Sequence, residues 1–229
     1  FLSEKDIQLG RGEPITDSAI VISSMVDAVM LRLSSHEDIV EFSKHSSKPV
    51  INALSDESHP CQILADLMTY QEEKGSIQGK KIAWIGDGCN VCQTYMQAAE
   101  IFDFELSIAT PAGYEPSEAF SQKYKKNINF FNNPMQACQE ADVVVTDVWT
   151  SMGQESEKKQ RESSFKGFQV DQLMMNQAKA DAVFMHCLPA YRGIEVSSEV
   201  IDGSQSVVWS EAENRLHAQK SLLLYLIED

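Results

Sequence analysis

Short apolar runs alternate with segments of helical spacing through the middle of the chain. The apolar runs at 82–85, 106–109 and 143–145 are separated by helical patterns, the first of which extends from Val91 to Phe102. This alternation predicts βαβ units, because neighbouring parallel strands are joined by a helix that crosses over the sheet. We therefore expect an α/β fold with a parallel sheet and helices on both of its faces.

A long helical pattern precedes this region and divides the chain. It opens at His59-Pro60, places apolar side chains on one face and ends at Gly75, a residue type that commonly terminates helices. We expect a domain boundary at this point. The predicted parts are a first domain at 1–74, a second domain at 75–212 and a C-terminal helix at 213–229.

Three further segments have patterns that predict their structure. Residues 26–33 are expected to form a buried strand that carries Arg32 at its end, and residues 206–209 are expected to form the last strand. The charged stretch 158–168 contains a glycine near its end, and we expect a surface loop followed by a turn there.

The chain carries a large excess of acidic residues. Its 34 Asp and Glu against 19 Lys and Arg give a net charge of −15, which argues against a nucleic-acid partner because phosphates must be neutralised by a basic surface. No apolar run approaches the roughly 20 residues of a membrane-spanning helix. The five scattered cysteines are typical of free thiols in a reducing compartment, so we expect a cytoplasmic protein, or an organellar one if a targeting peptide has been lost.

Polar groups follow the strand that the pattern predicts at 182–185. His186, Cys187 and a turn that includes Pro189 come directly after it. In open α/β sheets ligands bind beyond the carboxyl ends of the strands, so these groups would face a cleft. For a lone His-Cys pair, however, a buried cysteine that only packs at a strand end is the better interpretation.

Four strings in a fixed order support the functional interpretation. They are H-P-x-Q at 59–62, D-x-W-x-S-M-G at 147–153, H-C-L-P-A-x-R-G at 186–193 and A-E-N-R at 212–215. Together they resemble the ornithine carbamoyltransferases of the aspartate/ornithine carbamoyltransferase family. The resemblance implies two doubly wound parallel-sheet domains, the first incomplete, which are joined by a long helix and by a C-terminal helix that returns to the first domain.

The resemblance also implies which residues hold each substrate. Carbamoyl phosphate would be bound by Arg32, His59, Gln62 and Arg215, with Cys187 and Leu188 at its carbamoyl end. L-Ornithine would be bound by Asn90, Asp147, Ser151 and Met152. Cys187, Arg32 and His59 would be catalytic, with Cys187 positioning the amine rather than acting as a covalent nucleophile.

Individual motifs allow other interpretations. The turn Gly86-Asp87-Gly88 lacks the third glycine of a dinucleotide fingerprint, because Val91 stands there, and a turn that merely needs small residues is favoured. Cys89 and Cys92 form a C-x-x-C without a second ligand pair for zinc, so we favour coincidence. Asp147 alone could equally cap its strand in an Asx-type turn. Cys89 replaces an Asn of the family pattern.

One family motif is missing from the chain. The S-T-R-T-R phosphate-binding segment should lie upstream of Phe1, and Ile20 and Ser24 stand where arginines are expected. We expect an N-terminally truncated chain rather than a naturally short, degenerate paralogue, because the downstream site residues are present. We also expect this chain alone to turn over little, which measuring citrulline formation with and without a restored upstream segment would test.

The activity implied by the resemblance is transfer of the carbamoyl group from carbamoyl phosphate to the δ-amine of L-ornithine, giving L-citrulline and phosphate. No metal or organic cofactor is implied, and the expected assembly is a homotrimer or a multiple of trimers. A putrescine or related amine carbamoyltransferase and a catalytically silent paralogue or fragment are the alternatives. Roles in arginine synthesis and in arginine breakdown both stay open.

Overall fold

The computed structural model describes residues 1–2, 12–150 and 155–227, and it contains two parallel sheets. The smaller sheet pairs β1 (Val29–Arg32) with β2 (Val50–Leu54), and α2 (His36–His45) connects the two strands. Ser35 caps α2 by accepting a hydrogen bond from the Asp38 N–H. A small core between this sheet, α1 (Ile15–Ser23) and α2 is built around Ala19, Val29 and Phe42.

The larger sheet has the strand order β5-β4-β3-β6-β7, and all of its strands are parallel. These strands are β3 (Lys81–Ile85), β4 (Glu105–Ala109), β5 (Ile128–Phe131), β6 (Val143–Thr146) and β7 (Val183–His186). The chain proceeds outward from β3 to β5, returns to β6 beside β3 and then continues to β7. Because the direction reverses between β3 and β6, a crevice for ligands is expected at the carboxyl ends of these strands.

Both faces of the larger sheet are buried, as expected for parallel strands covered by helices. In β3 the side chains alternate between the two faces, so Ala83 and Ile85 belong to one core and Ile82 and Trp84 to the other. The face with Trp84 is covered by α3 (Pro60–Lys74) and α4 (Asn90–Phe102). The opposite face packs against α6 (Pro134–Ala137), α8 (Gln172–Met175) and α9 (Ser198–Ile201). Another short helix of this region is α5 (Glu118–Lys123).

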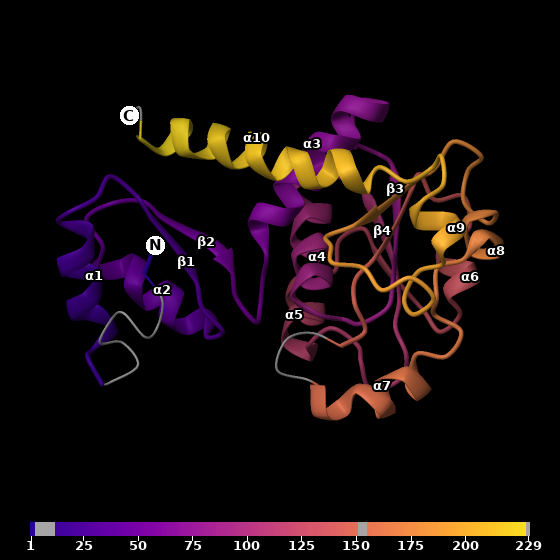
Figure 1. Ribbon diagram of the computed structural model, residues 1–229, viewed down its shortest axis with the longest axis horizontal. Coiled ribbons are helices and arrows are strands. Elements are labelled where there is room, and N and C mark those ends of the chain that lie inside the picture. Colours follow the sequence, from indigo (N-terminus) through magenta and orange to yellow (C-terminus); the bar gives the residue numbers. More distant parts are fainter. Residues whose placement is uncertain (3–11, 151–154, 228–229) are drawn as a thin grey trace.

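The long C-terminal helix α10 (Val208–Ile227) packs against α3 and extends toward the smaller sheet (Figure 1). Its buried residues are Val208, Glu211, Asn214 and Ala218, which follow helical spacing along one stripe. Asn214 donates hydrogen bonds to Thr69 and Glu72 of α3. The contact between the two helices is therefore partly polar. None of the described helices combines the length and the apolar composition that a bilayer crossing requires.

The structure confirms the α/β fold with parallel sheets and corrects three predicted segments. Only Ser206 of the strand predicted at 206–209 forms a bridge, to Phe184, because the chain enters α10 at Val208. The segment 158–168 is not a loop, since α7 (Lys158–Ser164) follows the 3-10 helix η2 (Glu155–Glu157). The strand predicted at 26–33 is shorter, and its Met30 is 44% exposed rather than buried.

Candidate active site

The crevice at the carboxyl ends of β3, β6 and β7 contains polar residues from three turns. After β3 comes the turn Gly86–Cys89, after β6 comes Asp147, and after β7 come His186 at the strand end and Cys187. Position 88 requires a glycine for steric reasons, because a Cβ there would lie 2.2 Å from the Pro116 nitrogen. This close approach supports a structural interpretation of the turn's small residues over a dinucleotide site.

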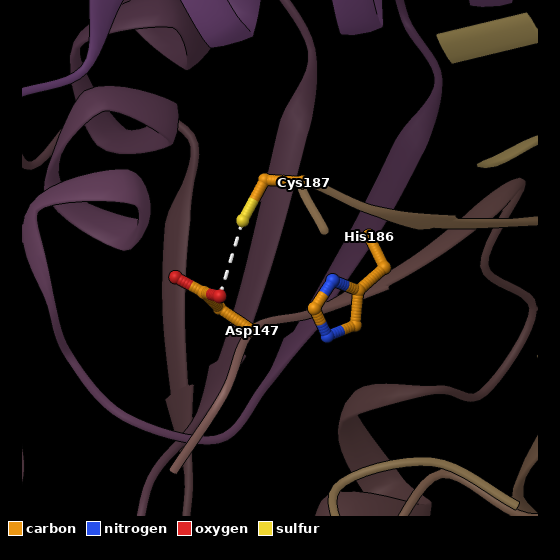
Figure 2. Close-up of side chains that lie close together, drawn as sticks. All are labelled: Asp147, His186 and Cys187. Carbon is orange, nitrogen blue, oxygen red and sulfur yellow. Dashed lines mark hydrogen bonds between the residues drawn. The ribbon is translucent and has the colours of Figure 1, made fainter. Parts of the chain in front are cut away.

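Two thiols meet one buried carboxylate in this crevice. Cys187 Sγ donates to Asp147 Oδ1 at 3.1 Å (Figure 2), and Cys89 Sγ donates to Asp147 Oδ2 at 3.7 Å. Burial and the neighbouring Asp147 carboxylate raise the pKa of Cys187 well above its usual range. The side chain is therefore a neutral thiol that donates a hydrogen bond, which argues against a thiolate nucleophile.

Both ring nitrogens of His186 contact groups that follow it in the chain. Its Nδ1 accepts the Leu188 N–H at 2.9 Å, and its Nε2 lies 3.2 Å from Glu195 Oε1, so Nε2 carries the ring proton. Asp147, His186 and Cys187 offer ligand atoms within 4.8 Å of one another. The imidazole has no free lone pair for a cation, however, because both of its nitrogens are engaged. Leu188 adopts a positive φ of 55° in this turn.

Three residues expected at carbamoyl phosphate approach one another from separate elements. His59 precedes α3 and is buried, Arg32 ends β1, and Arg215 lies on α10. Burial and then the charges of Arg215 and Arg32 lower the pKa of His59 to about 4, so its ring is neutral at neutral pH. Within the described residues, His59 Nδ1 and Arg215 Nε are buried without a hydrogen-bond partner. The arrangement gathers two cations and a neutral imidazole, which suits an anionic ligand.

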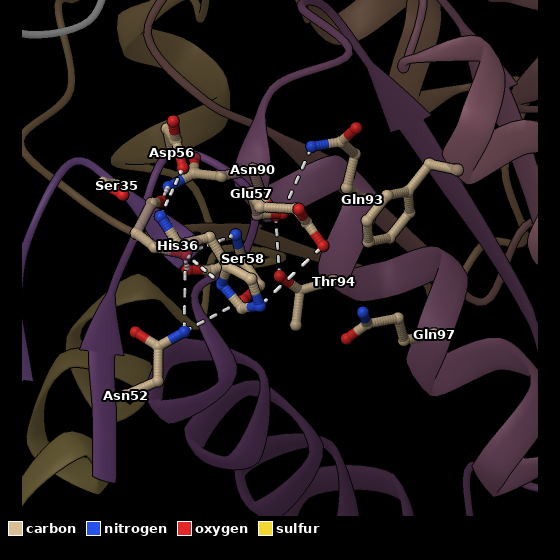
Figure 3. A network of polar contacts seen from close by, with 12 residues as sticks. Ser35, His36, Asn52, Asp56, Glu57, Ser58, Asn90, Gln93, Thr94 and Gln97 are labelled. Atoms are coloured by element: carbon tan, nitrogen blue, oxygen red, sulfur yellow. Dashed lines mark hydrogen bonds and ion pairs between the residues drawn. The ribbon is translucent and has the colours of Figure 1, made fainter. Parts of the chain in front are cut away.

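Asn90 connects the loop before α3 to the start of α4. Its Nδ2 donates to the Ser55 carbonyl at 2.6 Å, and the His59 N–H donates to Thr94 Oγ1 at 2.8 Å. The loop is held further by Gln93, which donates to the Glu57 carbonyl (Figure 3). Asn90 thus links the loop before α3 to the start of α4 and directly follows Cys89, and its role at ornithine stays a prediction. Of the residues predicted to hold ornithine, Ser151 and Met152 lie outside the described residues.

Sequence reasoning missed two sets of buried polar residues beside the site. The first set is the pair of carboxyl groups of Asp66 and Glu211. Asp66 and Glu211 both accept hydrogen bonds from Gln62 Nε2, at 2.8 and 2.9 Å. The spacing of Gln62, Asp66 and Thr69 is a signal that could have revealed this, because it places polar residues along one helical stripe.

The second missed set is the ion pair between Arg161 of α7 and Asp87 of the turn after β3. Arg161 Nη1 lies 2.7 Å from Asp87 Oδ2 and donates to the Trp149 carbonyl at 3.0 Å. The guanidinium also lies 4.9 Å from the centroid of the Tyr114 ring. No pattern in the charged segment distinguishes this arginine from its exposed neighbours.

Comparison with known families gives two matches that together span most of the chain. Residues 1–72 match the carbamoyl-P binding domain of the aspartate/ornithine carbamoyltransferases, and residues 78–226 match their Asp/Orn binding domain.

Individual proteins are similar over nearly the whole chain. The ornithine carbamoyltransferase of Ruthia magnifica is 66% identical over 227 residues, which cover 99% of this chain and 76% of that protein. That of Hydrogenovibrio crunogenus is 55% identical over 99% of this chain and 75% of its own length.

Solved structures agree with these matches. The ornithine carbamoyltransferase structure from Pyrococcus furiosus has a TM-score of 0.94 at 47% identity, covering 99% of this chain and 75% of that one. The structure from Burkholderia thailandensis has a TM-score of 0.91 at 49% identity, with 99% and 74% covered.

Proposed function

The chain belongs to the aspartate/ornithine carbamoyltransferase family, and from this premise we propose how its residues carry out the reaction. The activity is transfer of the carbamoyl group from carbamoyl phosphate to the δ-amine of L-ornithine, with L-citrulline and phosphate as products. The observation that carries the proposal is the pairing of two half-sites. One half contains His59, Arg215 and Arg32, and the other contains Asp147 and Cys187.

The first half-site is assigned to carbamoyl phosphate. In the reaction the amine nitrogen forms a bond to the carbamoyl carbon, the bond from that carbon to the phosphate oxygen breaks, and the nitrogen loses a proton. Negative charge develops on the carbamoyl oxygen and is stabilised by fixed donors, each worth about 3 kcal/mol in comparable sites. Arg32, His59 and Arg215 supply these donors. Because His59 is neutral, it donates a hydrogen bond rather than a proton.

The second half-site is assigned to ornithine. The Asp147 carboxylate accepts hydrogen bonds from the amino groups of the substrate, and the Cys187 thiol orients the δ-amine. By family resemblance Asn90, Ser151 and Met152 complete this half, and Leu188 offers its carbonyl to the carbamoyl amide. Much of the rate enhancement then comes from holding two substrates in one orientation.

A direct test measures citrulline formation from carbamoyl phosphate and ornithine by wild type and by an Asp147→Asn variant. Wild type is expected to form citrulline, and the variant is expected to lose affinity for ornithine more than for carbamoyl phosphate. Equal loss for both substrates would contradict the assignment of the two half-sites.

We further propose a homotrimeric assembly and a cytoplasmic role in arginine metabolism. The family resemblance of the whole chain supports the assembly, and the bacterial relatives support the location. Light scattering of the purified protein measures the assembly, and a monomer at working concentrations would contradict it.

A further inference from the structure

Two buried carboxyl groups lie between the half-sites and have no part in the reaction described above. Asp66 of α3 is 3% exposed, and Glu211 of α10 is 1% exposed. They meet at one amide group, because Gln62 Nε2 donates to Asp66 Oδ1 at 2.8 Å and to Glu211 Oε1 at 2.9 Å. Two ionised carboxylates this close together and out of water would repel each other strongly, so the pair is expected to retain a proton.

The surroundings decide where that proton resides. Tyr95 of α4 donates to Asp66 Oδ2 at 2.7 Å, which stabilises the ionised form of Asp66. Burial raises the pKa of Asp66 to about 6, and burial together with Asp66 raises the pKa of Glu211 well above its usual range. Arg215 of α10 and Cys187 after β7 are further titratable groups that face the pair. Because burial and the Asp66 carboxylate raise the pKa of Glu211, we assign the retained proton to Glu211.

The pair fixes the orientation of the Gln62 side chain. Both amide hydrogens point at carboxyl oxygens, and the amide oxygen Oε1 accepts from Arg215 Nη1 at 2.6 Å. A flipped amide would turn its oxygen toward the carboxyl pair and its NH₂ group toward the guanidinium. Gln62 consequently keeps its carbonyl on the side of Arg215.

Glu211 also holds the main chain beside the thiol. Its Oε2 accepts the His186 N–H at 2.9 Å. One carboxyl group thus contacts both Gln62, at the carbamoyl phosphate half-site, and the residue that precedes Cys187.

We propose that Asp66 and Glu211 are positioning residues that share one proton, fix the Gln62 amide and join it to the His186-Cys187 turn. The inference rests on the proposed function for its kinetic consequence alone. The proton that the carboxyl pair retains on Glu211 does not depend on the reaction.

The test compares three substitutions with a matched control on purified protein. Glu211→Met removes both acceptors, and kcat/KM for carbamoyl phosphate is expected to fall by about tenfold to a hundredfold. Glu211→Gln keeps one acceptor oxygen, and its kcat/KM is expected to lie between the values of Glu211→Met and wild type. Asp66→Asn keeps one acceptor oxygen for Gln62 or Tyr95 and leaves both Glu211 contacts in place, so its kcat/KM is also expected to lie between the values of Glu211→Met and wild type. Glu73→Gln alters an exposed acid on α3 and is the control.

An infrared measurement tests the shared proton without the reaction. Wild type at neutral pH is expected to show the carbonyl stretch of a buried protonated carboxylic acid, and Glu211→Gln is expected to lack it. A band that persists in Glu211→Gln, or kinetics of Glu211→Met and Asp66→Asn that match those of Glu73→Gln, would overturn the proposal. If Glu211→Met does not fold, the Glu211→Gln variant carries both comparisons. Absence of citrulline formation by wild type would contradict the proposed function and leave the infrared result to decide on the proton.

Discussion

At the scale of single residues, the role of Cys187 follows from the protonation of its thiol. The thiol is buried and donates to Asp147, so forming a thiolate there would place two negative charges side by side. A neutral donor can orient an amine but is a poor nucleophile. The reaction needs no acyl-enzyme, because the amine itself attacks the carbamoyl carbon.

Replacing Cys187 by Ser tests this role. Serine keeps a hydrogen-bond donor toward Asp147, so we expect Cys187→Ser to lower kcat by about tenfold or less, whereas Cys187→Ala removes the donor and should lower kcat by about tenfold to a hundredfold. Steady-state kinetics of Cys187→Ser and Cys187→Ala measure the difference between a retained and an absent hydrogen-bond donor. A carbamoylated Cys187 detected by mass spectrometry of wild type would contradict the positioning role.

His59 predicts a pH dependence of stability. Its pKa in the folded protein is lowered to about 4, below the ordinary value of 6.5, so between these values the unfolded chain binds more protons at this site. The stability conferred by the neutral ring is present above pH about 6.5 and is lost as the pH falls toward about 4, by up to about 3 kcal/mol.

Denaturant unfolding across this pH range measures the effect. The wild-type free energy of unfolding should fall more steeply on acidification than that of His59→Gln, while His217→Gln, on the exposed face of α10, should follow wild type. Parallel curves for wild type and His59→Gln would show that the ring is not held neutral by burial.

At the scale of elements, α7 is attached to the site through one buried ion pair. Arg161 is 6% exposed and Asp87 8% exposed, and the arginine also contacts the Trp149 carbonyl. The pair therefore joins α7 to the turn after β3 and to the segment after β6. These are the segments that carry Asn90 and Asp147.

Replacing Arg161 by Ala should be costly, because it leaves the Asp87 carboxylate buried without its cation. We expect the free energy of unfolding to fall by about 3 kcal/mol or more. Arg192 supplies the control, since its pair with Asp202 at 2.6 Å is exposed and Arg192→Ala should cost about 1 kcal/mol or less. Equal losses in the two variants, measured by urea denaturation, would contradict a structural role specific to the buried pair.

Elements with apolar periodicity were predictable from the sequence, and elements defined by buried polar residues were not. The runs that became β3, β4 and β6 consist of buried apolar side chains, so their pattern survives in the structure. In α7 the buried side chain is an arginine, and a charged segment with one buried arginine has the same pattern as a solvated loop.

The residues of the site also divide into those that the sequence indicated and those for which it gave no signal. Asp147 and Cys187 were predicted to flank ornithine from the family resemblance, and the structure brings their side chains into hydrogen-bond contact, while their roles stay a prediction. The link between Glu211 and His186 joins segments that are 25 residues apart, with no local signal for the contact. Asn90 was predicted at ornithine from the family resemblance and stays a prediction, and its amide donates to the Ser55 carbonyl.

At the scale of the whole molecule, the proposed mechanism divides substrate binding between the two sheets. The smaller sheet contributes Arg32, the larger sheet contributes Asp147 and Cys187, and α3 and α10 connect them. The arrangement predicts that each substrate is held mainly by its own part of the molecule and that both must be in place before transfer. The choice of amine then depends on the larger sheet.

The measurement that tests the central claim most directly is a competition between amines. The protein is given carbamoyl phosphate with equal concentrations of L-ornithine and putrescine, and the carbamoylated products are separated and quantified. The account predicts citrulline as the dominant product, because the site near Asp147 binds an amino acid and not only an amine. Carbamoylputrescine as the main product, or no carbamoyl transfer to either amine, would contradict it.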